Sequence, residues 1–149
     1  MIQSVQEQEI TLTSNTAPIT FADPDLRTGS ANCFNGWLNH NEDSAQFNIV
    51  MGGIYEIEFD ANVTSATAGS LAFGIFADGV KLNGAEMNEV IAAAGDYVNI
   101  SSNKLIRVCG RGNVTITVNS LPTVVYDGTS EATQIPVVKN ANIIIKKLA

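Results

Sequence analysis

Apolar and polar residues alternate with a period of two along most of the chain, which predicts β-strands rather than helices. The most regular stretch is residues 55–60, where three apolar side chains alternate with three acidic ones. Because successive side chains of a strand point to opposite faces, this stretch predicts a half-buried strand with an acidic outer face. That outer face carries Glu56, Glu58 and Asp60.

The same period, or an unbroken apolar run, predicts the other strands. These cover residues 46–51, 71–75, 80–82, 98–109, 114–118 and 143–145. The run Ile143–Ile145 is typical of a strand in the middle of a sheet. Asp78-Gly79 is typical of the type I′ turn of a tight hairpin, and Gly110–Gly112 joins the two strands on either side of it.

Three segments depart from the strand pattern. Residues 86–94 are rich in alanine and are followed by Gly95, which predicts a helix of at most two turns. The polar segment Leu121–Pro136 predicts a large surface loop. Residues 1–9 are polar and rich in Gln and Glu, which predicts an irregular N-terminal arm that is disordered in the isolated protein.

Many short strands separated by turns, without alternating helices, predict an all-β sandwich or barrel. The chain has 149 residues and a mass of 15.8 kDa, which is enough to bury the core of one domain. We expect an N-terminal arm and first strand over residues 1–20, and a single β-sandwich domain over residues 21–149.

Several segments, in their order along the chain, resemble C1q/TNF-like jelly-roll domains. Residues 47–59 (FNIVMGGIYEIEF) are similar to the start of the core in these domains: a short strand, a glycine turn and an aromatic strand. Residues 71–82, with their Asp-Gly hairpin, and residues 94–98 (AGDYV) resemble the segments that follow. Residues 140–148 (NANIIIKKL) resemble the closing core strand, so the resemblance covers residues 45–149.

This resemblance implies an eight-stranded jelly-roll β-sandwich without catalytic machinery. Members of the family generally assemble as trimers around a threefold axis, with the final strand near the axis, which implies a homotrimer here. The residues expected inside the sandwich are Ile57, Phe59, Phe73, Ile75, Ile116 and Ile145. The small size, the Asn-, Ala- and Thr-rich composition and the closing NANIIIKKL also resemble virion proteins of tailed bacteriophages, such as head decoration proteins, head fibres and tail appendages.

Charged residues make up only 15% of the chain, against about 25% in an average soluble protein. A surface of Asn, Ser, Thr and Ala loses little hydration on burial, which suits a protein packed against partners; a monomer with a neutral surface is the alternative. The net charge of −7, with eight Lys and Arg, argues against nucleic-acid binding. No apolar run approaches the roughly twenty residues of a membrane span, and the first nine residues lack the regions of a signal peptide.

Few residues are candidates for catalysis or for binding a metal ion. His40 lies in a polar stretch and is predicted to be an exposed loop residue without a nucleophile in suitable context. Cys33 and Cys109 lack partners at metal-site spacing; free, partly buried thiols are predicted, and a disulfide between them is the alternative. Oxygen ligands for calcium exist at Asp23, Asp25, Glu42 and Asp43, but no EF-hand pattern connects them. The sequence therefore predicts neither an enzyme nor a cofactor or metal.

Possible contacts with a partner come from two groups of residues. They are Phe34 and Trp37, which follow no strand period, and the acidic Glu56, Glu58 and Asp60. Aromatic residues of this kind are frequent anchors at interfaces, although packing onto the same sandwich is equally compatible with the pattern.

The predicted function is that of a structural virion protein, a trimeric jelly roll on the surface of a phage capsid or tail. Its predicted partners are copies of itself and the major capsid protein or another virion protein, with neither nucleic acid nor membrane. A receptor- or carbohydrate-binding module that acts through loops such as Leu121–Pro136 is the first alternative. An enzyme or soluble ligand of another type is the second.

Overall fold

The computed structural model describes residues 1–6, 9–22, 26–27, 36–122, 124–126 and 131–149. These residues form thirteen strands and contain no helix. The strands are β1 (Ile2–Gln6), β2 (Ile10–Thr11), β3 (Leu26–Arg27), β4 (Leu38–Asn39), β5 (Phe47–Ile49), β6 (Gly53–Ser65), β7 (Gly69–Ala77), β8 (Val80–Ile91), β9 (Val98–Val108), β10 (Val114–Leu121), β11 (Val124–Tyr126), β12 (Glu131–Thr133) and β13 (Pro136–Lys147).

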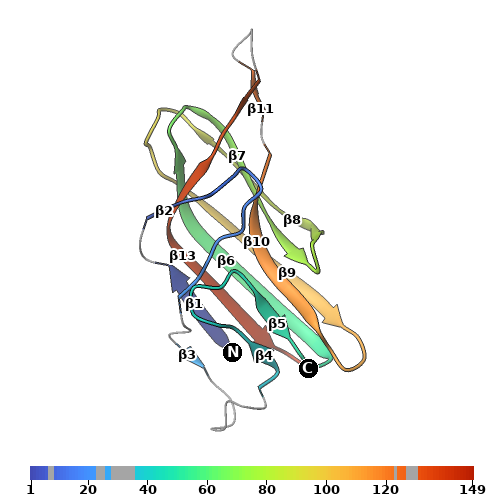
Figure 1. Ribbon diagram of the computed structural model, residues 1–149. Helices are drawn as coiled ribbons and strands as arrows, with labels where there is room; N and C mark the ends of the chain where they lie inside the picture. The colour runs from blue at the N-terminus through green and yellow to red at the C-terminus, as the bar shows by residue number, and fades with distance from the viewer. Residues whose placement is uncertain (7–8, 23–25, 28–35, 123, 127–130) are drawn as a thin grey trace.

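Two antiparallel sheets pack face to face (Figure 1). The six-stranded sheet has the order β3-β1-β13-β6-β9, with β2 also pairing with β13, and the five-stranded sheet has the order β4-β5-β10-β7-β8. The chain changes between these two sheets from β3 to β4, β5 to β6, β6 to β7, β8 to β9, and β9 to β10. The predicted all-β sandwich is confirmed, and the seven strands predicted by residue range correspond to β5 to β10 and β13.

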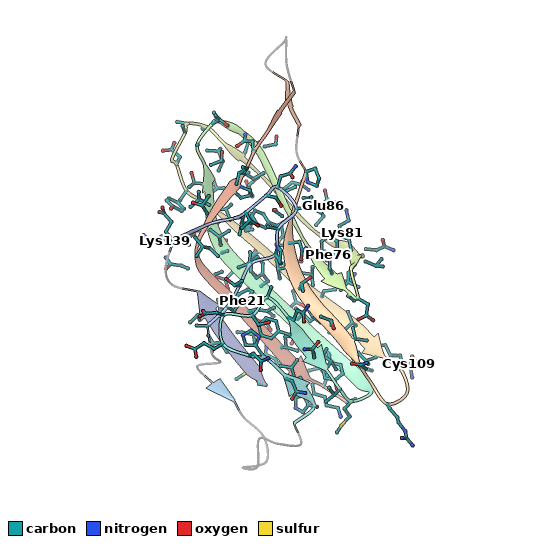
Figure 2. All side chains as sticks on the ribbon, in the orientation of Figure 1. Phe21, Phe76, Lys81, Glu86, Cys109 and Lys139 are labelled. Atoms are coloured by element: carbon teal, nitrogen blue, oxygen red, sulfur yellow. The ribbon has the colours of Figure 1, made fainter. Side chains whose placement is uncertain are left out.

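A core of apolar side chains fills the space between the sheets. All six residues predicted for the core are at most 2% exposed; they are Ile57, Phe59, Phe73, Ile75, Ile116 and Ile145. Phe21, which precedes β3, enters this core from a connecting segment (Figure 2). Its ring centroid lies 5.4 Å from that of Phe47 and 6.4 Å from that of Phe59. Phe21 therefore links the inner faces of the two sheets.

A β-bulge in β13 changes which residues face the core. Pro136 and Val138 are buried before the bulge, whereas every second residue from Ala141 to Ile145 is buried after it. The register with β6 shifts at the bulge, where Asn140 has a φ of 52°. An extra residue in one strand reverses the parity of its side chains, and asparagine tolerates the left-handed conformation. Strand β13 lies between β1 and β6, as predicted for an apolar strand in the middle of a sheet.

The hairpin predicted at Asp78-Gly79 is confirmed. Both residues have positive φ, 50° and 77°, and Ala77 pairs with Val80 across the two-residue turn. Positive φ at both central positions is the requirement of a type I′ turn. The N–H of Thr115 donates to Oδ1 of Asp78 at 2.8 Å, which anchors the turn to β10.

The helix predicted for residues 86–94 is wrong, because most of this segment belongs to β8, the edge strand of the five-stranded sheet. Glu86 pairs with Gly74 of β7, and Ile91 pairs with Gly69. Ala85 and Met87 are buried while Glu86 is exposed, which is the period of a strand. Alanine and glutamate favour a helix in isolation, but backbone pairing with β7 outweighs that propensity.

The segment predicted as a large irregular loop, Leu121–Pro136, instead contains β11 and β12, which pair with each other. This hairpin projects from one end of the sandwich (Figure 1). Gln134 closes its base, because Nε2 of Gln134 donates to the carbonyl oxygen of Ala68 at 3.0 Å and its Oε1 accepts from the hydroxyl of Ser65. The prediction of a surface position was correct, and the prediction of an irregular conformation was wrong for the described residues.

The predicted N-terminal arm forms strand β1 over Ile2–Gln6, which pairs with β13 along its whole length. The prediction of an irregular, disordered arm is wrong for these residues, because the edge of β13 supplies backbone partners whatever the side chains of the arm are. Tyr97 donates from its hydroxyl to Glu9, and this contact raises the pKa of Tyr97 to about 12. The division of the chain at residue 20 stays a prediction; strands on both sides of it join the six-stranded sheet.

Replacing Phe59 with alanine is expected to lower the free energy of unfolding by about 3–5 kcal/mol, because the buried ring would leave a cavity between the sheets. Val90→Ala on β8 is the control, since the Val90 side chain is exposed, and it should change the value by less than about 0.5 kcal/mol. Urea unfolding followed by the fluorescence of Trp37 measures both variants. Equal effects would contradict the placement of Phe59 in the core.

Candidate functional site

His40 is buried, with 5% exposure, and the prediction of an exposed loop histidine is wrong. Its ring stacks on Phe47 with the centroids 4.0 Å apart. Nδ1 lies 2.9 Å from the carbonyl oxygen of Gln46, and Nε2 lies 3.0 Å from that of Ala22. The ring therefore connects the segment before β3 to the start of β5. The polar neighbours of His40 in the sequence are exposed, so hydrophobic periodicity does not reveal its burial.

No group of three or more His, Cys, Asp or Glu side chains among the described residues could hold a metal ion. Glu42 and Asp43, two of the four calcium ligands considered from the sequence, are exposed. The other two, Asp23 and Asp25, lie outside the described residues. The described part of the chain thus contains no arrangement that argues for metal chemistry.

Cys109 is a free thiol and is exposed, whereas the sequence analysis predicted a partly buried one. Cys33 lies outside the described residues. The structure also contains, in its described part, no helix long and apolar enough to cross a membrane.

The outer face of the six-stranded sheet carries a network of polar side chains that runs across four strands. Lys146 of β13 pairs with Glu56 and Glu58 of β6, and its Nζ lies 3.4 Å from Oε2 of Glu56. Asn103 of β9 donates to Oε1 of Glu56 at 3.0 Å. We call this network, continued below, the polar ladder. It consists of Gln3, Glu56, Glu58, Asp60, Asn103, Asn142 and Lys146.

The second half of the polar ladder is centred on Asn142. Its Nδ2 donates to Oδ2 of Asp60 at 3.1 Å, and its Oδ1 accepts from Nε2 of Gln3 at 3.1 Å. All three acidic residues that the sequence placed on the outer face of β6 are therefore hydrogen-bonded to neighbouring strands of the same molecule. This gives them a structural task in addition to any contact with a partner.

The polar ladder favours the charged forms of Glu56 and Lys146. The hydrogen bond from Asn103 and the charge of Lys146 lower the pKa of Glu56, and the hydrogen bond to Glu58 and the charge of Glu56 raise the pKa of Lys146. Ion pairs this open to solvent contribute little to stability. Their main effect is to offset one of the three negative charges on the outer face of β6.

Apolar side chains on the same face lack comparable partners. Ile54, Leu105 and Leu148 are 40%, 58% and 55% exposed. Ile54 lies opposite Arg107, two residues from Leu105 on β9, and its carbonyl oxygen accepts from the N–H of Leu148 at 2.8 Å. Diagonal neighbours on one sheet face are within reach of long side chains. We call these three residues the apolar strip.

Three chain segments meet backbone to backbone at the end of the sandwich near the two termini (Figure 1). Glycines make this approach possible. A Cβ atom on Gly52 would lie 2.3 Å from the carbonyl oxygen of Gly110, and one on Gly112 would lie 2.3 Å from the backbone nitrogen of Met51. No other residue type fits at such distances without moving the backbone. The segments are residues 50–54, 109–113 and 147–149.

These segments border an open hollow of about 520 Å³, which we call the basal hollow. Met51, Ile54 and Val108 give it an apolar lining, and Arg107 and Cys109 complete the wall on the β9 side. Figure 2 shows Cys109 at this end of the molecule. The Met51 side chain is 44% exposed. The hollow is therefore accessible and mostly apolar, with a cation at its side.

Trp37, which the sequence suggested as a partner contact, is partly buried close to the basal hollow. Its ring packs against Tyr55 with the centroids 5.3 Å apart, and its carbonyl oxygen accepts from the N–H of Val50 at 2.9 Å. The hydroxyl of Tyr55 donates to the carbonyl oxygen of Met51 at 2.7 Å. Trp37 thus supports the segment that lines the hollow. Phe34 lies outside the described residues, and a partner contact through any of these residues stays a prediction.

Sequence reasoning missed the apolar strip and the basal hollow. On the outer face of β9, Leu105 lies between the polar residues Asn103 and Arg107. A leucine at a position where the pattern calls for a polar residue was a sign of exposed apolar surface. Ile54 and Leu148 are far apart in sequence and become neighbours only through the pairing of β6 with the end of β13. Hydrophobic periodicity alone does not predict such a register.

No protein-family model matches the chain, and no curated protein matches it. Solved structures that share its fold include the globular domain of zebrafish complement 1qA, with a TM-score of 0.64, 12% identity, and 99% of this chain and 96% of that chain covered. They also include the TNF protein Eiger from S. frugiperda, with a TM-score of 0.62, 8% identity and coverage of 99% and 92%. Murine APRIL at pH 5.0 has a TM-score of 0.59, 13% identity and coverage of 99% and 98%.

The chain therefore has the C1q/TNF-like jelly-roll fold, over nearly its whole length, and the predicted fold class is confirmed. Identities this low establish the fold alone.

Replacing His40 with alanine is expected to lower the free energy of unfolding by about 2–4 kcal/mol, because the stacked ring and its polar contacts with the carbonyl oxygens of Gln46 and Ala22 are lost. Asn39→Ala is the control, since the neighbouring Asn39 is exposed. Chemical denaturation of both variants gives the comparison. If His40→Ala unfolds at the same denaturant concentration as Asn39→Ala, the buried position is contradicted.

Gly112→Ala is expected to destabilise the protein more than Gly110→Ala, although both glycines have positive φ, 86° and 64°. A Cβ at residue 112 would meet the backbone nitrogen of Met51 at 2.3 Å, whereas one at residue 110 has nothing within 4 Å. Left-handed strain of about 1–2 kcal/mol is common to both variants, so their difference isolates the backbone contact. We expect that difference, measured by urea unfolding, to exceed about 1 kcal/mol; equal losses would mean that the segments do not touch.

Proposed function

We propose that this chain is a non-enzymatic structural module that assembles as a homotrimer through the outer face of its six-stranded sheet. The observation that carries the proposal is the apolar strip, which is exposed on a face where the acidic residues of β6 are already hydrogen-bonded or ion-paired within the molecule. Exposed apolar side chains surrounded by satisfied polar groups are typical of a protein interface.

The composition of the sheet face supports burial against another copy. Lys146 offsets one of the two negative charges of Glu56 and Glu58, and Asp60 is hydrogen-bonded to Asn142, so each acidic residue of this face already has a partner within the chain. The low content of charged residues in the whole chain points in the same direction, because amide and hydroxyl groups cost less to desolvate than ions.

The position of the last strand also supports a trimer. Strand β13 lies in the middle of the six-stranded sheet, and Ile144 on its outer face is half-buried. The resemblance to C1q/TNF-like domains implies a threefold axis near the final strand. A threefold arrangement is closed, so it would cover this face without leading to an open fibre.

We further propose that the assembly decorates or projects from a virion, with the major capsid protein or another virion protein as its second partner. This part rests on the small size of the chain, its Asn-, Ala- and Thr-rich composition and its NANIIIKKL ending, which resemble those of tailed-phage virion proteins. Detection of the protein in many copies in purified particles would support it. Absence from purified particles would refute it.

One observation favours a second function, that of a receptor- or carbohydrate-binding module. The β11–β12 hairpin projects at the end of the sandwich opposite the termini, where a tip that binds a receptor would be expected (Figure 1). A glycan array probed with the full chain tests this alternative directly. Binding that is lost when the hairpin is replaced by a short turn would support it.

Light scattering of the purified protein at micromolar concentration is expected to give three times the chain mass of 15.8 kDa. Leu105→Lys should shift this mass toward a single chain, because it places a cation in the proposed contact. The lysine would lie opposite Glu56 and so would not destabilise the folded chain by repulsion of like charges.

Thr117→Lys is the matched control, since Thr117 lies on the outer face of the other sheet, and it should leave the mass unchanged. A wild-type mass equal to one chain would refute the trimer. A trimer that survives Leu105→Lys would refute the assignment of the contact to this face.

A further inference from the structure

The end of the sandwich around the basal hollow differs in charge from the rest of the molecule. The three stretches that build it, residues 50–54, 105–114 and 145–149, contain four of the eight Lys and Arg and none of the fifteen Asp and Glu. The chain as a whole has a net charge of −7. Positive charge is therefore concentrated at this one end of an acidic protein.

Three of these four cations form no ion pair with a residue that the structure describes, and one of the three, Lys147, contacts a methionine sulfur instead. Lys146 pairs with Glu56 and Glu58, and Nζ of Lys147 lies 2.9 Å from the sulfur of Met51. Arg107 and Arg111 form no ion pair with any residue that the structure describes, and both are exposed. Two guanidinium groups beside an apolar hollow are thus available to an anionic partner, and arginine suits carboxylates particularly well.

The shape of this end indicates what kind of partner fits. The hollow has an apolar lining that includes Met51, and the exposed Val50 lies next to Met51 in the chain. A concave, apolar site receives a projecting side chain better than it receives a flat surface such as a lipid bilayer. Its walls are backbone segments held in contact at glycines, so the site is formed before any partner binds.

We propose that the basal hollow is a docking site for a segment of another protein that presents an apolar side chain flanked by carboxylates. The apolar side chain enters the hollow against Met51 and Val108, and the carboxylates pair with Arg107 and Arg111. The inference rests on the proposed function for its role, which is attachment of the module to a second protein. It names the chemistry of that second protein, and it is tested separately from trimer formation.

The experiment uses the full chain and a rhodamine-labelled heptapeptide with a Leu-Trp-Leu centre and two glutamates on each side. Fluorescence anisotropy is expected to show saturable binding in the micromolar range that weakens as salt is added. Arg111→Glu, in the loop beside the hollow, should weaken binding about tenfold through lost pairing and new repulsion. Lys139→Glu makes the same change of charge on another part of the surface, next to Tyr97, and should leave binding within about twofold.

A second readout locates the bound peptide. The same peptide, carrying a cysteine activated as a mixed disulfide, should form a disulfide with the exposed thiol of Cys109. Cys109→Ser should abolish this product, because no thiol is then left in the wall of the hollow. Attachment that persists in Cys109→Ser would place the peptide elsewhere and overturn the proposal.

Three further outcomes would overturn the docking site: no saturable binding, equal binding of a peptide with lysines in place of the glutamates, or equal loss in Arg111→Glu and Lys139→Glu. Binding to phosphatidylserine vesicles without binding to the peptide would replace the protein partner with a membrane. Light scattering on the same samples separates this site from the trimer. A trimer that does not bind the peptide refutes the docking site alone, and a monomer that binds it refutes the trimer alone.

Discussion

The pairing of β6 with β13 determines the two faces on which the rest of the molecule depends. Strand β6 pairs with β13 on one side and with β9 on the other, so its side chains alternate between the core and the outer face over thirteen residues. The bulge at Asn140 lets β13 follow this alternation, although the parity of its own apolar residues changes. Without the bulge, either Val138 or the run from Ala141 to Ile145 would face the wrong side.

The same register explains why the outer face is both charged and apolar. It places Lys146 beside Glu56 and Glu58, so part of the negative charge of β6 is offset from within the sheet. It also places Leu148 beside Ile54, beyond the last of these charges. The side chains of the apolar strip therefore remain exposed to solvent in a single chain. The proposed contact between copies of the chain would bury them.

Features governed by neighbours in sequence could be predicted, and features governed by distant partners could not. The alternation of residues 55–60 and the Asp78-Gly79 turn are local, and both were read correctly. Strand β8 was mistaken for a helix because an edge strand buries few side chains, so its composition resembles that of a polar helix. Predicting the burial of His40 would have required knowing that carbonyl oxygens of residues 22 and 46 lie on either side of its ring.

The candidate site follows the same division. The acidic residues of β6 were identified from their period, but their pairing with Lys146 and Asn142 depends on a strand more than eighty residues away. The basal hollow was invisible for a similar reason. Gly52-Gly53 and Gly110–Gly112 were recognised as turns, yet the reason for glycine at residues 52 and 112 is contact between the two turns.

The hydrogen bonds of Gln134 at the base of the β11–β12 hairpin have a consequence for how the sequence of such a protein can vary. Gln134 is tied to Ser65 and Ala68, and the described residues of β11 and β12 pair only with each other. The registers of β10 and β13 are thus set independently of what lies between them. Natural variation in the length or sequence of that hairpin would be tolerated by the sandwich, so related proteins could acquire new tips on an unchanged body.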